Sequence, residues 1–187
     1  MKIIKSFFDN TVFLLEPKHH KDKRGIFFET YNKLIFKELG IINNFTQDNN
    51  SISNKKNTFR GIHLQVNPYE QAKLIRVVKG EIIDYIIDLR KNSKSFGKYI
   101  AINLSPKLNH IIYIPKGFGH GFLTIKNNTI VNYKVDKKYS KFHSKSIIFS
   151  DSSININFKG FNTKKFILSN NDKAGMSLKD FKKFYIK

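Results

Sequence analysis

The chain contains neither cysteine nor tryptophan, and only 14 of its 187 residues are acidic. Without cysteine it can have no disulfide framework, no thiolate nucleophile and no cysteine metal site. Long apolar runs are missing too. The N-terminal segment 1–15 is interrupted by Lys5 and Asp9 and has no small-residue cleavage site. We therefore expect neither a signal peptide nor a membrane span, which favours a cytoplasmic protein.

Basic residues outnumber acidic ones by 34 to 14, which gives a formal net charge of +20 at pH 7. Such a charge first suggests nucleic acid or an anionic membrane as a partner. However, only four of the basic residues are arginines, and the lysines are scattered through loops among many Asn, Ile and Phe residues. This pattern favours a compositional bias, so we expect no nucleic-acid or membrane partner. A non-enzymatic basic binding protein remains an alternative.

Short apolar segments separated by Gly, Asn and Pro turns recur along the chain, which is typical of an all-β sandwich or barrel. The expected strands are 11–15, 26–28, 74–78, 81–89, 99–104, 110–114, 121–125, 130–135 and 146–149. Helical spacing in 34–39, with Gly40 as C-cap, predicts a short helix near the N-terminus. A capping box from Ser177 to Asp180 predicts another near the C-terminus. No linker or repeat divides the chain, so we expect residues 1–187 to form one domain.

The segment 60–73 gathers polar side chains just before an apolar strand. It contains Arg60, His63 and Lys73, with two glutamines and a glutamate between them. A ring nitrogen that titrates near neutrality, ten residues before a fixed cation, suits a proton transfer that creates negative charge. Alternatively, His63 is a hydrogen-bonded core residue.

Two further polar signals lie in the strands that follow. Asp84 lies in the apolar segment 82–89, where a buried charge needs a partner. It is therefore either the structural partner of a cation or a site residue. Pro115 and Gly117 predict a tight turn between strands, with His120 at its exit.

The pattern Pro-x-Gly-x-x-His, together with His63 on an earlier strand, resembles the cupin family. In that family the first motif usually supplies His-x-His and a glutamate as metal ligands, whereas this chain has His63-x-Gln65. His63, Glu70 and His120 could still form a facial triad, so a metal-dependent cupin remains an alternative. Because glutamine is a poor ligand and Lys73 would repel a dication, we expect no metal site.

Eight segments carry a closer resemblance. They are DKRGIFFE at 22–29, QDN at 47–49, FRGIH at 59–63, QAKLIRV at 71–77, DLRKNSKSFG at 88–97, IPKGFGHGF at 114–122, YK at 133–134 and LSNND at 168–172. In order and spacing they resemble the dTDP-4-dehydrorhamnose 3,5-epimerase family, and together they cover the chain from about residue 12 to 175.

This resemblance implies a double-stranded β-helix (the cupin jelly roll), a homodimer, and no metal or organic cofactor. The implied reaction converts dTDP-4-dehydro-6-deoxy-D-glucose to dTDP-4-dehydro-L-rhamnose by epimerisation at C3 and C5, in the dTDP-rhamnose pathway to surface polysaccharide. His63 corresponds to the catalytic base and Asp172 to the carboxylate that orients its ring. Lys73 corresponds to the cation beside the enolate oxygen, and Tyr133 to the acid that returns the proton on the opposite face.

The resemblance also implies a set of substrate contacts. Arg24 and Arg60 correspond to diphosphate contacts, which suits the bidentate guanidinium. The other implied contacts are Glu29, Gln47, Asp48 and Asn49 for the sugar and thymidine, His120 for the substrate, and Tyr139 for stacking under the thymine ring. Part of this set is expected to come from the other subunit.

Some positions depart from the family pattern. Leu64, Tyr113 and Phe149 replace larger aromatic residues, which indicates altered packing. Asn171 stands where lysine is common, and Ser144 or His143 where a glutamate often touches the substrate. These departures leave the nucleotide and sugar preference open, so a mono-epimerase or an epimerase of another nucleotide-linked 4-keto sugar is the alternative.

Three of the implied site residues could instead have purely structural roles. Taken singly, Tyr133 could serve only in packing, Asp172 could be a loop residue that accepts backbone hydrogen bonds, and Tyr139 could be an exposed turn residue.

Overall fold

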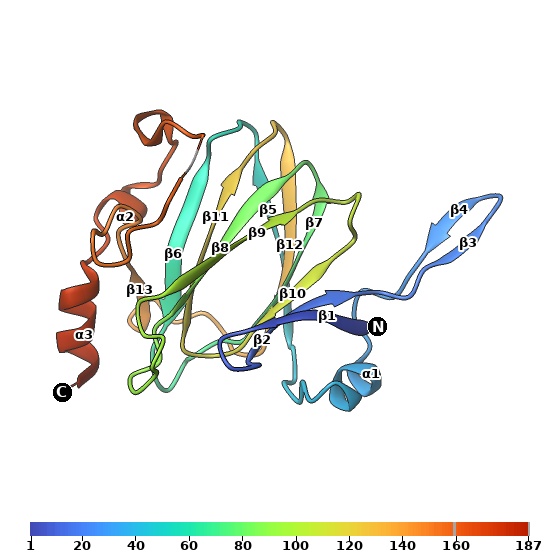
Figure 1. Cartoon of the computed structure of the whole chain (residues 1–187), viewed down its shortest axis with the longest axis horizontal. Coiled ribbons are helices and arrows are strands. Elements are labelled where there is room, and N and C mark those ends of the chain that lie inside the picture. Colours follow the sequence, from blue (N-terminus) through green and yellow to red (C-terminus); the bar gives the residue numbers. More distant parts are fainter. Residues whose placement is uncertain (159, 187) are drawn as a thin grey trace.

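The computed structural model describes residues 1–158 and 160–186, and its main feature is a pair of antiparallel sheets that pack face to face (Figure 1). The six-stranded sheet has the order β1, β2, β10, β7, β12, β5, and the five-stranded sheet the order β13, β6, β11, β8, β9. The strands of the first sheet are Lys2–Phe7, Val12–Glu16, Ile111–Ile114, Lys73–Lys79, Thr129–Val135 and Gln47–Ser53. Those of the second are Ser144–Ser146, Phe59–Gln65, Phe118–Thr124, Ile82–Asp88 and Tyr99–Leu104. The predicted all-β sandwich is confirmed.

Apolar side chains from both inner faces form the core between the sheets. Val77 and Val131 contribute from the six-stranded sheet, and Ile86 and Phe122 from the five-stranded sheet. Strand β8 is apolar on both faces because alternate side chains, such as Tyr85, point into a second apolar cluster on the outer face. The inner faces are therefore the surfaces on which polar residues of a site would meet.

The C-terminal segment covers the outer face of the five-stranded sheet. It contains a 3-10 helix η1 (Thr163–Lys165), the single-turn helix α2 (Asn170–Lys173) and helix α3 (Leu178–Ile186), and it lies beside β6 and β13 in Figure 1. The apolar cluster on this face includes Phe181 of α3. The predicted capping box is confirmed, because the Asp180 backbone N–H donates to Ser177 Oγ at 3.1 Å. Within the described residues, no helix has the length and apolar character needed to cross a membrane.

Helix α1 (Lys33–Glu38) packs on the outer face of the six-stranded sheet. The Asn32 side chain caps its first turn by accepting from two backbone N–H groups. At its other end Gly40 adopts a φ of +81°, a conformation that favours glycine. The predicted N-terminal helix is therefore confirmed.

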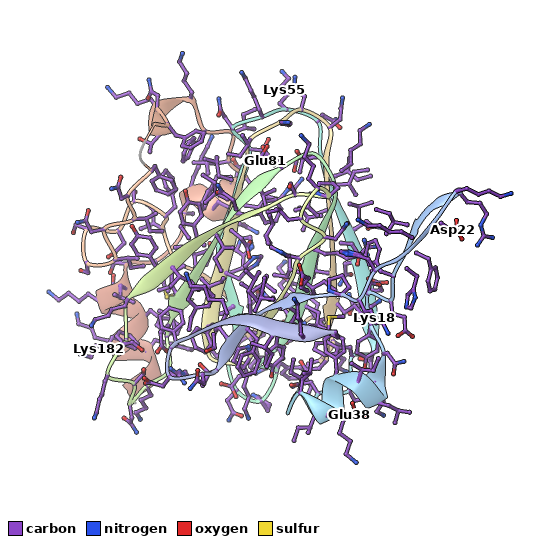
Figure 2. The ribbon with its side chains drawn as sticks, turned by 45° about the vertical axis from the view of Figure 1, so that its right-hand side comes forward. Lys18, Asp22, Glu38, Lys55, Glu81 and Lys182 are labelled. Carbon is purple, nitrogen blue, oxygen red and sulfur yellow. The ribbon has the colours of Figure 1, made fainter. Side chains whose placement is uncertain are left out.

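A hairpin of β3 (His20–Asp22) and β4 (Gly25–Phe27) projects from the body of the molecule (Figure 1). We call residues 20–27 the arm. Figure 2 labels Asp22 on this arm, on the opposite side of the molecule from Lys182 of α3. The sequence predicts a polar turn at 19–25 followed by a strand, but the polar residues form the first strand of the hairpin.

Several strand predictions were incomplete or wrong. The strand expected at 146–149 is β13, Ser144–Ser146, and Ile147 makes only an isolated bridge beyond it, to Met176. The chain leaves the sheet there because Ile147 and Phe149 pack into the outer apolar cluster. Strands β1 and β5 were not predicted, since both are rich in polar residues and lie at sheet edges, where few apolar side chains are needed.

Candidate functional site

His63 and His120 lie directly opposite each other on the neighbouring strands β6 and β11. The strands approach closely because Gly61 and Gly121 face each other, and a Cβ atom on Gly121 would lie 2.9 Å from the Arg60 carbonyl oxygen. Because alternate residues share a face, His120 points to the same inner side as Phe122 in the core between the sheets. Both rings therefore face the space between the sheets.

His63 is paired with Asp172 of α2. The distance from His63 Nε2 to Asp172 Oδ1 is 2.5 Å, and the side chains are 44% and 3% exposed. Ser169 caps α2 and holds Asp172 in place by accepting its backbone N–H. Burial by itself would raise the pKa of Asp172, but the hydrogen bond and charge of His63, with Ser169, hold that pKa below its ordinary value. The result is an ionised carboxylate behind a ring that remains accessible.

His120 is paired with Asp84 of β8 at 2.6 Å between Nε2 and Oδ1. Here the ring is almost fully buried and the carboxylate has no exposed surface. Burial lowers the pKa of His120, and the nearby charges of Lys73 and His63 lower it further, although Asp84 opposes the shift. His120 is therefore a neutral ring near pH 7.

Lys73 is the first residue of β7 and is buried. It pairs across the sheet with Val135, and Tyr133 pairs with Ile75, so Lys73 and Tyr133 are diagonal neighbours on the inner face. Burial lowers the pKa of Lys73 to about 8, and the charge of Asp84 opposes that shift. The side chain is thus an ammonium near neutral pH that loses its proton in mildly alkaline solution.

Tyr133 lies on β12 and packs against the core between the sheets. Burial raises its pKa, and the charge of Arg60 opposes the shift. Asn49 on the neighbouring strand β5 donates to the Tyr133 carbonyl oxygen at 3.4 Å and accepts from Gln47 at 2.7 Å. Arg60 reaches the same strand, with Nε 3.1 Å from Ser53 Oγ.

The structure does not bring every predicted residue to this space. Arg24 lies on the arm, almost fully exposed, and binds Asp22 at 2.6 Å. Glu29 follows the arm and accepts a hydrogen bond from Asn32. Asp48 points to the outer face of β5, where it binds Lys134 and Asn132. Within one copy these side chains do not face His63.

Tyr139 is exposed on a loop that is tied to the site by Gln65. The Gln65 amide donates to the carbonyl oxygens of Tyr69 and Lys138 and accepts the backbone N–H of Ser140 at 2.6 Å. All its polar atoms are thus used in holding residues 138–140. This explains why glutamine stands where a cupin ligand is expected.

For Asp84 the sequence left two alternatives open, the structural partner of a cation or a site residue, and the structure pairs it with His120 of the site. Its position in an apolar strand signalled a buried charge, but the identity of its partner depends on the strand order that places β8 beside β11. The described part of the chain contains no group of three or more His, Cys, Asp or Glu side chains arranged to hold a metal. Both His63 and His120 instead direct Nε2 to carboxylates.

Three comparisons with known proteins identify the family of this chain. Residues 10–180 match the family model described as dTDP-4-dehydrorhamnose 3,5-epimerase. The chain is 40% identical over 181 residues to such an enzyme from Shigella flexneri, covering 96% of this chain and 97% of the relative. A crystal structure of the Bacillus anthracis enzyme with TDP and PPi bound has a TM-score of 0.89 at 40% identity, covering 94% of this chain and 98% of that one. The Legionella pneumophila enzyme in complex with dTDP-4-keto-L-rhamnose has a TM-score of 0.88 at 33% identity, covering 95% and 93%.

Proposed function

The chain belongs to the dTDP-4-dehydrorhamnose 3,5-epimerase family and is an isomerase with that activity, and we propose how its residues carry out the reaction. The observation that carries the proposal is the pair of His63 and the buried Asp172. An ionised carboxylate can only accept a hydrogen bond, so His63 Nε2 carries the hydrogen and Nδ1 has the free electron pair. His63 Nδ1 is therefore the base that removes the proton beside the C4 ketone of a dTDP-linked 4-keto-6-deoxyhexose.

Removal of the proton moves charge to the ketone oxygen. The electron pair of the broken C–H bond forms a carbon–carbon double bond to C4, and the C4–oxygen π electrons move to oxygen. Lys73 stabilises this enolate as a buried ammonium, whose attraction is strong because water is excluded. The same cation serves both C3 and C5, since both carbons flank C4.

Tyr133 returns a proton to the opposite face of the carbon. Its raised pKa keeps the phenol protonated near neutral pH, so that it can act as an acid. Each inversion leaves His63 protonated and Tyr133 as a phenolate, and exchange with water restores both before the next carbon reacts.

We also propose that the chain functions as a homodimer in which the arm of each copy reaches the site of the other. A two-stranded hairpin is marginally stable alone, and the arm exposes Ile26 and Phe27 by 53% and 68%. Burial against a second copy would remove these apolar side chains from water. Arg24 on the arm and Glu29 just after it would then lie at the site of the partner copy.

The nucleotide contacts follow from this assembly. Arg24 forms an exposed ion pair with Asp22, which is weak enough to be exchanged for a diphosphate. Gln47 and Asn49 pair with Val135 and Tyr133 and so lie on the inner side of β5, where Gln47 is exposed to solvent, as is Arg60. Tyr139 offers an exposed ring for stacking on thymine. To reach the nucleotide in the same copy, the Asp48 side chain would have to leave Lys134 and Asn132. A nucleotide-linked sugar as substrate supports a cytoplasmic location. The core cluster to which both sheets contribute supports a single domain over residues 1–187.

The function is tested by proton NMR of the protein with dTDP-4-keto-6-deoxyglucose in deuterated water. Loss of both the H3 and H5 signals is expected. His63→Ala should slow both losses by about 10²- to 10⁴-fold, whereas His110→Gln, a control at the residue that precedes β10 of the opposite sheet, should not. Loss of one signal would instead indicate a mono-epimerase, and an undiminished rate in His63→Ala would overturn the assigned base.

A further inference from the structure

Asp84 is a buried charge to which the mechanism above gives no role. It has no exposed surface and lies on β8 between Phe122 of β11 and Ile102 of β9. A carboxylate in such surroundings is costly unless cations or hydrogen bonds compensate for it. The compensation must therefore come from the inner face, which Asp84 shares with the site.

The two carboxylate oxygens of Asp84 are in different situations. Oδ1 accepts the hydrogen of His120 Nε2 at 2.6 Å. Oδ2 is buried and has no hydrogen-bond partner among the described residues. Buried oxygens are rarely left in this way, and a role in a functional site is one of the reasons for which they are. The charge that favours this carboxylate is the ammonium of Lys73, with which it interacts electrostatically.

The hydrogen bond from His120 to Asp84 determines which ring nitrogen of His120 is turned toward the substrate. Since the carboxylate cannot donate, His120 Nε2 carries the hydrogen, and the neutral ring has a free electron pair on Nδ1. Unlike His63, His120 is almost fully buried, and it lies near the ammonium of Lys73 and the ring of His63. When His63 takes up a proton, its charge makes protonation of His120 still less favourable. His120 is thus suited to accept a hydrogen bond from a sugar hydroxyl, not to remove a proton.

We propose that Asp84 is a positioning residue that serves two groups of the site at once: it orients the His120 ring toward the sugar and supplies the negative charge that keeps Lys73 an ammonium. This inference rests on the proposed roles of Lys73 and His120. The ionisable groups of the site around Lys73 come from four strands. They are Asp84 on β8, His120 on β11, His63 on β6 and Tyr133 on β12. Asp84 is the anion among them, so its removal leaves three neighbours that carry no negative charge near pH 7.

The test is the pH profile of kcat/KM for the full chain and its Asp84→Asn variant. Lys73 is charged below its pKa of about 8, so wild-type activity should fall above that pH. Without the carboxylate the pKa of Lys73 should drop, and the alkaline decline should begin about 1 pH unit lower or more. Deprotonation of Tyr133 does not contribute to the decline in this pH range, because burial raises its pKa above the ordinary value of 10.0.

Asp88→Asn is the matched control, since Asp88 is equally buried on the same strand but binds Arg90, Ser93 and Ser95. It should lower stability and leave the alkaline decline where it is. An unchanged decline in folded, active Asp84→Asn, or the same shift in Asp88→Asn, would overturn the proposal. A wild-type protein that exchanges neither H3 nor H5 would instead contradict the proposed function.

A second measurement is independent of whether Asp84→Asn folds. Long-range ¹H–¹⁵N spectra of the wild-type protein resolve the tautomers of its six histidines, and His120→Gln assigns the relevant signals. A neutral ring with hydrogen on Nε2 is expected for His120 at pH 7. Hydrogen on Nδ1 alone, or a fully protonated ring, would overturn the assigned orientation.

Discussion

His63 and His120 lie directly opposite each other on β6 and β11, and each ring directs its Nε2 atom to a different carboxylate. The two pairs differ in burial and in their neighbours. The His63 ring is 44% exposed, whereas the His120 ring is 11% exposed and lies close to the charge of Lys73. In the proposed mechanism the more exposed ring, His63, takes up the proton, and the buried ring, His120, stays neutral.

Replacement of Lys73 by methionine should lower kcat by about 10²- to 10³-fold, because the enolate oxygen loses its cation. KM should change less, since the charge develops only in the transition state. Lys73→Arg keeps a cation that does not titrate, so any activity it retains should persist above pH 8, where wild-type activity declines. Lys79→Met, an exposed position at the end of the same strand, is the control. A wild-type kcat in Lys73→Met would contradict the assigned role.

Replacement of Tyr133 by phenylalanine should separate proton removal from inversion. Proton abstraction by His63 continues, but the acid on the opposite face is missing, so formation of the epimerised product should fall by about 10²- to 10⁴-fold. Loss of the H3 and H5 signals in deuterated water should fall less. Tyr31→Phe provides a control on the outer side of the six-stranded sheet. Parallel declines in exchange and product formation would argue against Tyr133 as the separate acid.

The arm can be tested through the oligomeric state. Phe27→Asp should weaken the homodimer, because a charge replaces an exposed apolar side chain that the partner is proposed to cover. Sedimentation velocity over a range of concentrations measures the change. Leu108→Asp alters an exposed apolar residue away from the arm and should leave the dimer intact. A wild-type protein that is monomeric at all concentrations would contradict the proposed assembly.

The origin of Arg24 can be tested by mixing two impaired variants. If Arg24 acts in the partner's site, a heterodimer of Arg24→Ala and His63→Ala contains one complete site. A co-refolded equimolar mixture should then recover about one quarter of wild-type activity, since half of the dimers are mixed and each has one of two sites. If Arg24 acts within its own copy, no site is complete, and the mixture will be no more active than the average of its components.

Asp88 should make stability depend on acidity. Burial alone would raise its pKa, but hydrogen bonds from Arg90, Ser93 and Ser95 lower it from 3.8 to about 2. A depressed folded-state pKa gives stability that is present above the unfolded value and is lost as pH falls from about 4 toward about 2. Asp88→Asn should therefore cost about 2 kcal/mol of unfolding free energy at pH 7, and much less near pH 2.

Urea unfolding at several pH values measures this difference. Glu38→Gln, at an exposed position on α1, is the control and should change the pH dependence little. A constant difference between wild type and Asp88→Asn over this range would show that the carboxylate titrates normally in the folded protein.

The sequence alone predicted the family, the all-β sandwich, both short terminal helices and the turn before His120, and these predictions are confirmed. Such features are local, because alternation of apolar side chains, capping residues and Pro-x-Gly turns depend on neighbours in the chain. The epimerase activity was also predicted, from the order and spacing of eight motifs, and the comparisons confirm it. The individual roles of His63, Lys73, Tyr133 and Asp172 stay predictions.

Only the tertiary structure decided which residues share the interior. Strand pairing places His120 against His63 and next to Asp84, although Asp84 is 36 residues from His120 in the chain. The three residues of the QDN motif are adjacent in the chain, but side chains along β5 point alternately to opposite faces of the sheet. Asp48 therefore points to the outer face, whereas Gln47 and Asn49 point to the inner face. The arm, which includes Arg24, projects away from the two sheets that hold most of the other site residues (Figure 1). The types and spacing of the residues in the sequence determine which chemical groups are available. Strand order and register determine which of these groups contact one another, because such contacts depend on pairing between segments that are distant in the chain.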